Sequence, residues 1–545
     1  MEMNIIGLLV SSAVLLLLAY RFYGRFLANK LGLRNENTTP AHTLRDNIDY
    51  VPSKTSVVLG HHFASIAGAG PIVGPIIAVA FGWIPALLWV LLGGIFFGAV
   101  HDLTSLAASL RHKGKSIGVV IEAYIGSLGK KLFLIFSFAT LLLVIAVFAD
   151  IVAKTFVKVP TAATASAGFM ALAMVFGWAL RRFSMPFWLL STIGVIIMYA
   201  FIYVGELFPL NLSYSVWILI LLAYIYFAAV TPVWLILQPR DYLNSYLLYG
   251  MMIFGIIGVF VANPSIKMDS SISFEVESLG YLFPVLFVTI ACGALSGFHS
   301  LVASGTTSKQ IDKEENALAI GYGGMLIESL LAVLSISAVI VLSREDYISR
   351  LTTVGPVTLF SEGLGGFISS LGVPLNIGIS FVALTVSAFA LTSLDTCTRL
   401  ARFALQEYFE TEKIAGAKML SENRHLSTFI TVIVSALLII SGEFAVLWPI
   451  FGSANQLLGA LALLAVTVWL FKKGLNPWFT LIPMFFMFAV TLSSLIIFAW
   501  KNFGQQHYLL GVIAVVLFIL AVVLLLLAKK SLSGLLQPMK ETSPN

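Results

Sequence analysis

The sequence predicts an all-α protein that crosses a membrane about fifteen times and contains inverted repeats with broken helices. Of its 545 residues, 59% are hydrophobic and only 11% are charged, and the mean hydropathy is +0.97. Apolar stretches of spanning length follow one another along almost the whole chain, and glycine and proline are concentrated at 60–75, at the start of one of them. A soluble domain of this length does not have this composition, so a polytopic membrane protein is predicted.

Fifteen stretches meet or approach the ~20 apolar residues that a helix needs to cross a membrane. They cover residues 4–20, 64–80, 82–110, 132–153, 162–180, 187–204, 214–237, 246–262, 280–304, 317–342, 374–398, 427–447, 450–471, 476–500 and 508–528. The first is interpreted as a retained anchor helix, because Glu2 rather than a basic region precedes it and Arg21 follows it. Helical continuity is weakest in the second and the ninth stretch.

Lysine and arginine predict the orientation. If the connecting loops alternate between the two sides, one side holds 26 of the 32 basic residues and the other holds six. This count places Arg240 in a loop and no basic residue inside a span. The positive-inside rule then puts the N-terminus outside and the C-terminus in the cytoplasm.

The same placement of basic residues excludes other classes of function. The net charge of +6 comes from residues at helix ends, where topology and anionic lipid explain it, so nucleic-acid binding is not expected. Cys292 and Cys397 both lie within spans and are expected to be reduced core residues. No HxxxH or CxxC spacing predicts a metal site, and no GxSxG, HExxH or phosphate-binding glycine loop predicts an enzyme.

The segment GHHFASIAGAGPIVGP at 60–75 predicts a helix that is interrupted at membrane depth. Glycine and proline at this density weaken a continuous helix and expose backbone groups that can bind a ligand. Broken helices of this kind mark substrate sites in transporters. The candidate substrate-binding residues here are His61, His62, Ser65, Gly68 and Gly70.

A second segment, GFHSLVASG at 297–305, repeats the G-x-H-x5-G pattern of GHHFASIAG at 60–68. The predicted topology runs the two copies in opposite directions, so they are related by inversion, as in alternating-access transporters. Small residues selected for tight helix packing are the alternative explanation. Candidate substrate-binding residues in the second copy are Ser296, His299, Ser304 and Thr306. The expected division is an anchor helix and cytoplasmic loop (1–63), a first repeat (64–279), an inverted second repeat (280–528) and a cytoplasmic tail (529–545).

Carboxylates inside the spans are candidates for the coupling site. Glu328 lies about 16 Å along the tenth span, near the middle of the ~30 Å hydrocarbon layer, where a carboxylate must be protonated, paired or in contact with water. Asp102 is the second choice. Asp395 is either a functional group or the partner of Arg399 and Arg402, which follow at helical spacing. The remaining two, Asp150 and Glu443, are placed at helix ends.

Other polar groups leave two roles open. His61, His62, His101 and His299 cluster in three spans, which favours proton relay or substrate hydrogen bonding over packing or metal binding. Asn455 and Gln456, near the start of the thirteenth span, either line the substrate route or cap their helix after Pro449. Thr392 and Ser393 could hold Na⁺ beside exposed carbonyls, although such hydroxyls more often bond their own backbone.

Seven segments, in order along the chain, resemble the carbon starvation protein A (CstA) family. They are NIDYVPSKTSVVLGHHFASIAGAGPIVGP (47–75), HDLTSLAASLRHKGKSIG (101–118), TPVWLILQPRDYLNSYL (231–247), ACGALSGFHSLVASGTTSKQI (291–311), GYGGMLIESL (321–330), ALTSLDTCTRLARFALQ (390–406) and LWPIFGSANQLLGALAL (447–463). The resemblance covers most of the chain. It implies a fold similar to the amino acid, polyamine and organocation transporter group.

The resemblance also implies a function. Members of this family are associated with uptake of peptides and of pyruvate, so we expect a secondary active importer of small carboxylated nutrients in the bacterial inner membrane, coupled to protons. A Na⁺-coupled carrier of the same fold, a channel, and a membrane-embedded sensor or enzyme are the alternatives. No cofactor is expected beyond a coupling ion, H⁺ or Na⁺. The expected partners are the substrate and membrane lipid, and the oligomeric state is left open.

Overall fold

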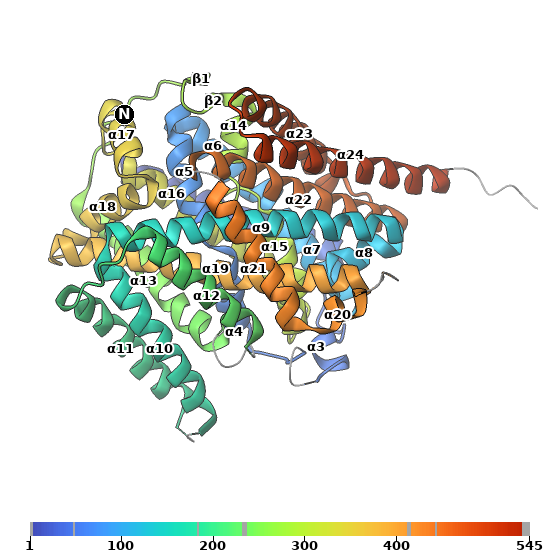
Figure 1. The fold of residues 1–545 in the computed structure, drawn as a ribbon, viewed down its shortest axis with the longest axis horizontal. Coiled ribbons are helices and arrows are strands. Elements are labelled where there is room, and N and C mark those ends of the chain that lie inside the picture. Colours follow the sequence, from blue (N-terminus) through green and yellow to red (C-terminus); the bar gives the residue numbers. More distant parts are fainter. Residues whose placement is uncertain are drawn as a thin grey trace, which may run out of the picture.

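A computed structural model describes residues 4–46, 50–182, 185–231, 237–410, 412, 416–441 and 444–536. Nearly all of the described chain is helical, and long helices run side by side through the body of the molecule (Figure 1). The all-α prediction is confirmed. Each of the fifteen predicted stretches overlaps at least one helix of the structure.

The long apolar helices form most of the fold. They are α1 (Ile5–Leu18), continued by η1 (Ala19–Gly24) and α2 (Arg25–Lys30); α6 (Trp83–Gly93), η3 (Gly94–Gly98) and α7 (Ala99–Arg111); α9 (Ser127–Lys158); α10 (Pro160–Arg182); α11 (Phe187–Leu207); α13 (Leu237–Ala262); η5 (Leu318–Gly323) and α16 (Gly324–Val339); α19 (Leu375–Glu410); α22 (Phe444–Lys472); α23 (Trp478–Gly504); and α24 (Tyr508–Leu536).

Shorter elements complete the described chain. They are α4 (Thr55–Ile66), α5 (Gly70–Ala78) and η2 (Val79–Phe81); α14 (Leu282–Thr289), α15 (Gly297–Gly305) and η4 (Thr307–Lys309); α12 (Tyr214–Val230) and α21 (Arg424–Ser441); α3 (Pro40–Thr43), α8 (Ile117–Tyr124), α17 (Arg344–Thr353), α18 (Pro356–Ser369) and α20 (Ala417–Glu422); and the antiparallel strands β1 (Glu275–Val276) and β2 (Gly280–Tyr281).

The number of spans differs from the prediction. Among the described residues, 11 helices are long and apolar enough to cross a membrane, or 12 if the pair α4 and α5 forms one bent span. Helices α12 and α21 are apolar but shorter, and the α14–α15 pair does not meet the same test. The count of fifteen is therefore not confirmed. The predicted boundary at residue 63 also falls inside α4.

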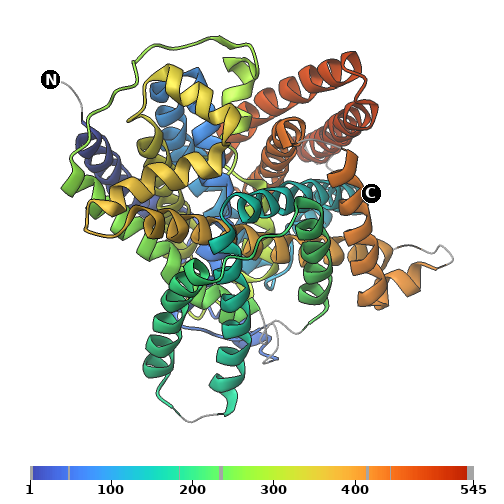
Figure 2. The same cartoon turned by 60° about the vertical axis from the view of Figure 1, so that its left-hand side comes forward.

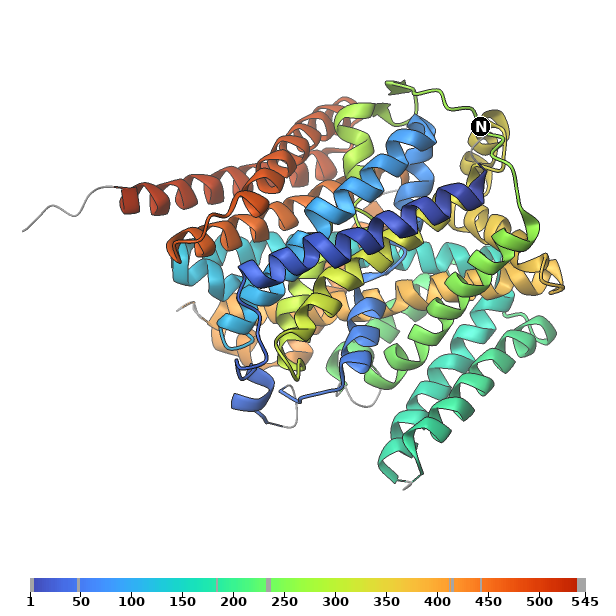
Figure 3. The ribbon, with the colours of Figure 1, turned by 180° about the vertical axis from the view of Figure 1, so that it is seen from behind.

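Helices α19 and α22 lie at the centre of the bundle. In the most apolar 18-residue segment of each helix, 89% and 94% of the residues are buried. The hairpin of α10 and α11 projects from one side of the molecule (Figure 2), and α1 crosses the face seen in Figure 3, where it is dark blue. Helices α23 and α24 pack together on the side of the molecule away from the α10–α11 hairpin (Figure 1). The central helices can therefore carry polar groups away from lipid.

The two broken spans, α4–α5 and α14–α15, lie beside each other in opposite directions. Just before α4, the backbone N–H groups of Val51 and Ser53 donate to the carbonyls of Lys309 and Gln310, which follow α15, at 3.1 and 3.0 Å. At the other end, the Ser273 N–H, ahead of α14, donates to the carbonyl of Phe81, which follows α5, at 2.9 Å. The antiparallel relation expected from the repeated motif is present in the structure.

Candidate functional site

The first broken span bends by 46° between α4 and α5. Gly68 and Gly70 lie at this bend in close contact with other elements. A Cβ atom on Gly68 would overlap the side chains of Ser393 and Phe148, and one on Gly70 would overlap the side chain of Cys292. Glycine is needed at both positions because the bend packs directly against α9, α19 and the second broken span.

The second broken span is interrupted between Thr289 and Gly297, and α22 supplies the partners for its backbone. The Phe298 N–H at the start of α15 donates to Asn455 Oδ1 at 3.0 Å, and Gln456 Nε2 donates to the carbonyl of Phe287 at 2.7 Å. Asn455 Nδ2 also donates to Ser296 Oγ at 2.9 Å. Asn455 and Gln456 thus bond the backbone of α15 and α14 and do not cap their own helix, and their place on the substrate route stays a prediction.

Four buried side chains beside these breaks form the Glu328 cluster: His101 and Asp102 from α7, His299 from α15 and Glu328 from α16. Asp102 lies between the two histidines, with Oδ1 2.7 Å from His101 Nδ1 and Oδ2 2.9 Å from His299 Nδ1. The other ring nitrogen of His299, Nε2, is 3.5 Å from Glu328 Oε2. All four residues are fully buried. The structure therefore joins Glu328, Asp102 and His299 in one cluster, as three members of the predicted site.

The Glu328 cluster has no fixed positive charge. No described lysine or arginine pairs with either carboxyl group, and neither oxygen of Glu328 has a hydrogen-bond partner among the described residues. An unpaired charge in the hydrocarbon region costs at least ~2.5 kcal/mol. Protons shared among its carboxyl groups and imidazoles can therefore balance the charge of this cluster.

His62 lies next to this cluster on α4. Its Nδ1 is 2.8 Å from Thr307 Oγ1, which follows α15, and its ring packs against Gly324 at the start of α16. His62 is fully buried, and its Nε2 has no hydrogen-bond partner among the described residues. It connects the first broken span to the end of the second.

His61, the neighbour of His62, belongs to a separate group that we call the Arg240 cluster: His61 (α4), Tyr224 (α12), Arg240 and Asp241 (α13), and Asp395 (α19). Arg240 forms ion pairs with Asp395 and with Asp241, the latter at 3.0 Å. The Tyr224 hydroxyl donates to Asp395 Oδ2 at 2.6 Å, and His61 Nδ1 is 3.2 Å from Asp241 Oδ2. The two consecutive histidines therefore do not share one site.

Two predictions about basic residues are corrected here. Arg240 is not in a loop: it lies in α13 and is 1% exposed, because Asp241 and Asp395 neutralise it. The described ion pair of Asp395 is with Arg240 and not with Arg399 or Arg402. Those two side chains instead donate to backbone carbonyls at the end of α12, where helix carbonyls lack partners.

The remaining predicted hydroxyls mostly bond backbone groups. Ser304 Oγ donates to the Ser300 carbonyl at 2.6 Å, and Thr306 Oγ1 donates to the Val302 carbonyl at 3.0 Å. Ser393 Oγ donates to the Ser65 carbonyl at 3.3 Å, whereas the Ser65 hydroxyl has no partner among the described residues. Among these hydroxyls, Ser65 is thus the one without a described hydrogen-bond partner.

Two further carboxylates, Asp150 and Glu443, are predicted to lie at helix ends. Asp150 accepts a hydrogen bond from Tyr214 at 2.7 Å and pairs with Lys154 at 2.9 Å. Glu443 lies outside the described residues. Within the described chain, no group of three or more His, Cys, Asp or Glu side chains is arranged to hold a metal ion.

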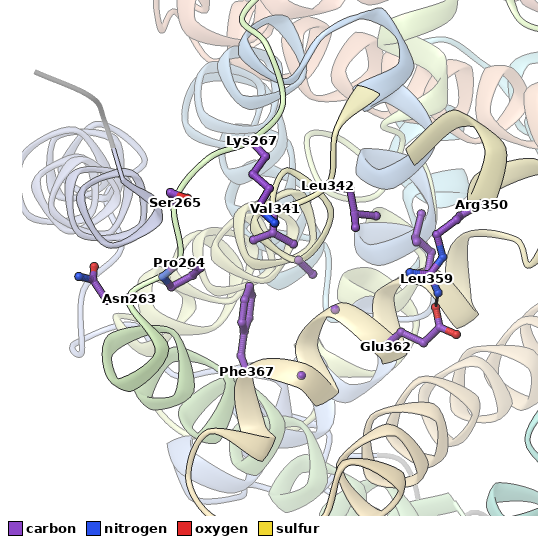
Figure 4. Close-up of a pocket in the computed structure, with 13 residues that line it drawn as sticks. Asn263, Pro264, Ser265, Lys267, Val341, Leu342, Arg350, Leu359, Glu362 and Phe367 are labelled. Carbon is purple, nitrogen blue, oxygen red and sulfur yellow. Dashed lines mark hydrogen bonds and ion pairs between the residues drawn. The ribbon is translucent and has the colours of Figure 1, made fainter. Parts of the chain in front are cut away.

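A pocket of about 550 Å³ opens beside α18, where α13 and α16 end (Figure 4). It begins about ten residues beyond Glu328 along the chain. Its lining includes Asn263, Lys267, Phe367 and the ion pair of Arg350 with Glu362. None of the predicted site residues lines it. It is an opening at one end of the bundle and is separate from both clusters.

Sequence reasoning missed three members of the Arg240 cluster. Arg240 and Asp241 are adjacent in LQPRDYLN, and an Arg–Asp pair beside an apolar run is a signal that both are buried together. Tyr224 has no such signal, because aromatic residues are common throughout α12.

Antiparallel broken spans that bring buried ionisable groups to the centre of a helical bundle define a secondary membrane transporter. The comparisons with known proteins agree. The family model described as "Carbon starvation protein CstA" matches residues 4–353 and 348–494, and this chain belongs to that family. The predicted membership is confirmed.

Two relatives are named as transporters, and a solved structure has a similar fold. "Peptide transporter CstA" from Campylobacter jejuni is 31% identical over 90% of this chain and 80% of its own length. "Pyruvate/proton symporter BtsT" from Escherichia coli is 30% identical over 91% of this chain and 81% of its own length. The crystal structure of a manganese transporter from Eremococcus coleocola aligns with a TM-score of 0.50 and 11% identity, covering 90% of this chain and 99% of that one. At this identity, the structural match concerns the fold alone.

Proposed function

We propose that this protein is a proton-coupled importer of small carboxylated nutrients, either peptides or pyruvate, in the bacterial inner membrane. The names of the relatives supply the two substrate classes. The observation that carries the coupling is the Glu328 cluster, in which two carboxyl groups and two imidazoles are fully buried without a described lysine or arginine partner. Such a cluster binds protons in place of fixed counter-charges, as a coupling site must.

Glu328 carries the coupling proton in this proposal. His299 lies between Glu328 and Asp102, so a proton on Glu328 is passed to the imidazole, and Asp102 stabilises the resulting imidazolium. His299 is also part of α15, one half of the second broken span. A change in protonation therefore acts directly on an element that has to move during alternating access.

The substrate carboxylate binds between the two breaks. The N-termini of α5 and α15 carry the positive ends of their helix dipoles, which favour an anion there. His62, Ser65 and His299 are the side chains closest to this role, because His62 Nε2 and the Ser65 hydroxyl lack partners among the described residues. Gly68 and Gly70 allow the close approach of the two spans, and Asn455 and Gln456 hold the second break open.

The topology of the proposal follows the positive-inside rule, with the N-terminus outside and the C-terminus in the cytoplasm. Residues 64–279 and 280–528 act as two inverted repeats, whose relative motion exposes the substrate site to one side at a time. Moving Arg240 from a loop to a buried pair does not change this direction, since the remaining bias is still large.

Uptake by purified protein in proteoliposomes tests the function. With an inward proton gradient, labelled pyruvate or a labelled dipeptide should accumulate above its external concentration, and running both substrates side by side separates the two classes. Accumulation that depends on a Na⁺ gradient alone would show that Na⁺, and not H⁺, is the coupling ion. Flux that only equilibrates the substrate would contradict a coupled carrier and favour a channel.

A further inference from the structure

The neighbours His61 and His62 point to different clusters. Consecutive residues of a helix are rotated by about 100° around its axis. His62 contacts Thr307 beside the Glu328 cluster, whereas His61 faces Asp241 on α13. The first half of the broken span is therefore in contact with two separate sets of buried acids.

Two buried carboxyl groups of the Arg240 cluster, those of Asp241 and Asp395, share one guanidinium, and Arg240 is the one described lysine or arginine that pairs with either of them. Tyr224 is a neutral donor to Asp395. The buried guanidiniums of α19 donate to carbonyls at the end of α12. Asp241 Oδ2 is the carboxyl oxygen that faces His61, and a proton on His61 offsets the charge of this second carboxyl group.

His61 and Asp241 lie close enough to share a proton, and neither facing atom has another partner among the described residues. Their closest atoms, Nδ1 and Oδ2, are 3.2 Å apart, yet neither makes a hydrogen bond among the described residues. A proton on Nδ1 gives Oδ2 a partner once the imidazole turns so that its N–H points at the oxygen. Because the side chain of His61 is 12% exposed and that of Asp241 is fully buried, the proton enters through His61.

Each element packed against α4 carries titratable or charged groups. They include Arg240, Asp241 and Tyr249 on α13, Asp395, Arg399 and Arg402 on α19, His299 on α15, Tyr322 on η5 and Glu328 on α16, with His62 next along α4 itself. Among these, Asp241 is the group in contact with His61. The described ion pairs join no member of the Arg240 cluster to the Glu328 cluster, so the two clusters bind protons as distinct sites.

We propose that the His61–Asp241 pair is a second proton-binding site of this carrier, loaded through His61 and balanced by Arg240 and Asp395. This inference rests on the proposed proton-coupled function and adds a second coupled proton to it. Protonation ties α4 to α13 through a charged hydrogen bond, and loss of the proton releases the first half of the broken span. Both sites contact α4: His61 belongs to the Arg240 cluster, and His62 lies against the Glu328 cluster.

The first test is the limiting accumulation ratio in proteoliposomes at a difference of one pH unit, with the membrane potential clamped at zero. Each coupled proton then multiplies the ratio about tenfold, because one pH unit is a tenfold ratio of proton activity. His61→Gln and Asp241→Asn should each lower the ratio about tenfold. The double variant should lower it no further, because both changes remove the same proton.

The second test does not depend on a gradient. Calorimetric titration of the purified carrier with substrate, in two buffers of different ionisation enthalpy, gives the number of protons taken up on binding. Both variants should take up about one proton fewer than the wild type. Asp241→Asn leaves Arg240 and Asp395 as a balanced pair, and His61 is at the rim of the cluster, so both variants should fold.

The matched control is His42→Gln, which removes an exposed histidine paired with Asp312 at 2.7 Å in the connecting segments. It should change neither the ratio nor the proton count. An unchanged ratio and proton count in His61→Gln and Asp241→Asn would overturn the second site and leave the proposed function standing. A wild-type carrier that accumulates no substrate in a proton gradient would instead overturn the proposed function.

Discussion

The Glu328 cluster and the Arg240 cluster are both buried at the first broken span, but their charges are balanced in different ways. The Arg240 cluster contains a guanidinium, which stays protonated in proteins, so most of its charge is fixed. The Glu328 cluster contains two carboxyl groups and two imidazoles without a described lysine or arginine partner, so bound protons can balance its charge. A fixed counter-charge suits a group that holds helices together, and exchangeable protons suit a group that changes state during transport.

Removing the fixed charge should have the largest effect on folding. Arg240→Met leaves Asp241 and Asp395 buried without a counter-charge, which should destabilise the protein by about 3–5 kcal/mol. Thermal unfolding in detergent measures this loss. Arg350→Met is the control, because its pair with Glu362 is partly exposed and such pairs contribute about 0–1 kcal/mol. Equal stability of the two variants would show that the ion pairs of Arg240 do not stabilise the fold.

Removing the exchangeable proton should affect transport and leave folding intact. Glu328→Gln keeps the shape of a protonated Glu328 and breaks no described hydrogen bond, so stability should change by less than about 1 kcal/mol. At a difference of one pH unit the accumulation ratio should fall about tenfold, because only the proton of the His61–Asp241 pair remains coupled, while exchange of substrate across the membrane remains measurable. Glu362→Gln serves as the control and should transport normally. Full concentrative uptake by Glu328→Gln would move the coupling role to Asp102 or to another group.

Only part of this difference between the clusters could be predicted from the sequence. Glu328 could be predicted from depth alone, because a carboxylate eleven residues into an apolar stretch has no basic partner along the helix. The second break could be predicted because GFHSLVASG repeats the first motif. Both signals are local, since each depends on residues within one segment.

The rest depends on contacts between segments far apart in the chain. Arg240 and Asp395 are 155 residues apart, and the nearer Arg399 had the helical spacing that seemed to explain Asp395. Asn455 and Gln456 look like a cap of their own helix, yet they bond to a helix that lies about 160 residues earlier. Periodicity gives the face of a helix, but it does not give the helix that packs against that face.

The close contact between the two breaks should matter to the Glu328 cluster more than to the Arg240 cluster. His299 follows the second break, whereas the Arg240 cluster lies mainly on α12, α13 and α19. Gly70→Ala places a methyl group on the Cys292 side chain, and such overpacking typically costs about 1–3 kcal/mol. Uptake at a fixed proton gradient should fall by a larger factor than stability alone explains. Combining it with Cys292→Ala, which removes the sulfur, should restore part of the activity.

The smallest effect is expected at His62, where the two clusters come closest along the chain. If His62 bonds the substrate carboxylate through its free Nε2, His62→Ala should weaken binding by about 0.5–1.5 kcal/mol, a two- to tenfold rise in Kd. Thr307→Val is the matched control, since it removes the partner of Nδ1 and leaves Nε2 in place. A loss of affinity in His62→Ala alone assigns the ring to the substrate. An equal loss in both variants means that the His62–Thr307 bond positions α4, and unchanged affinity in His62→Ala makes this histidine a packing residue.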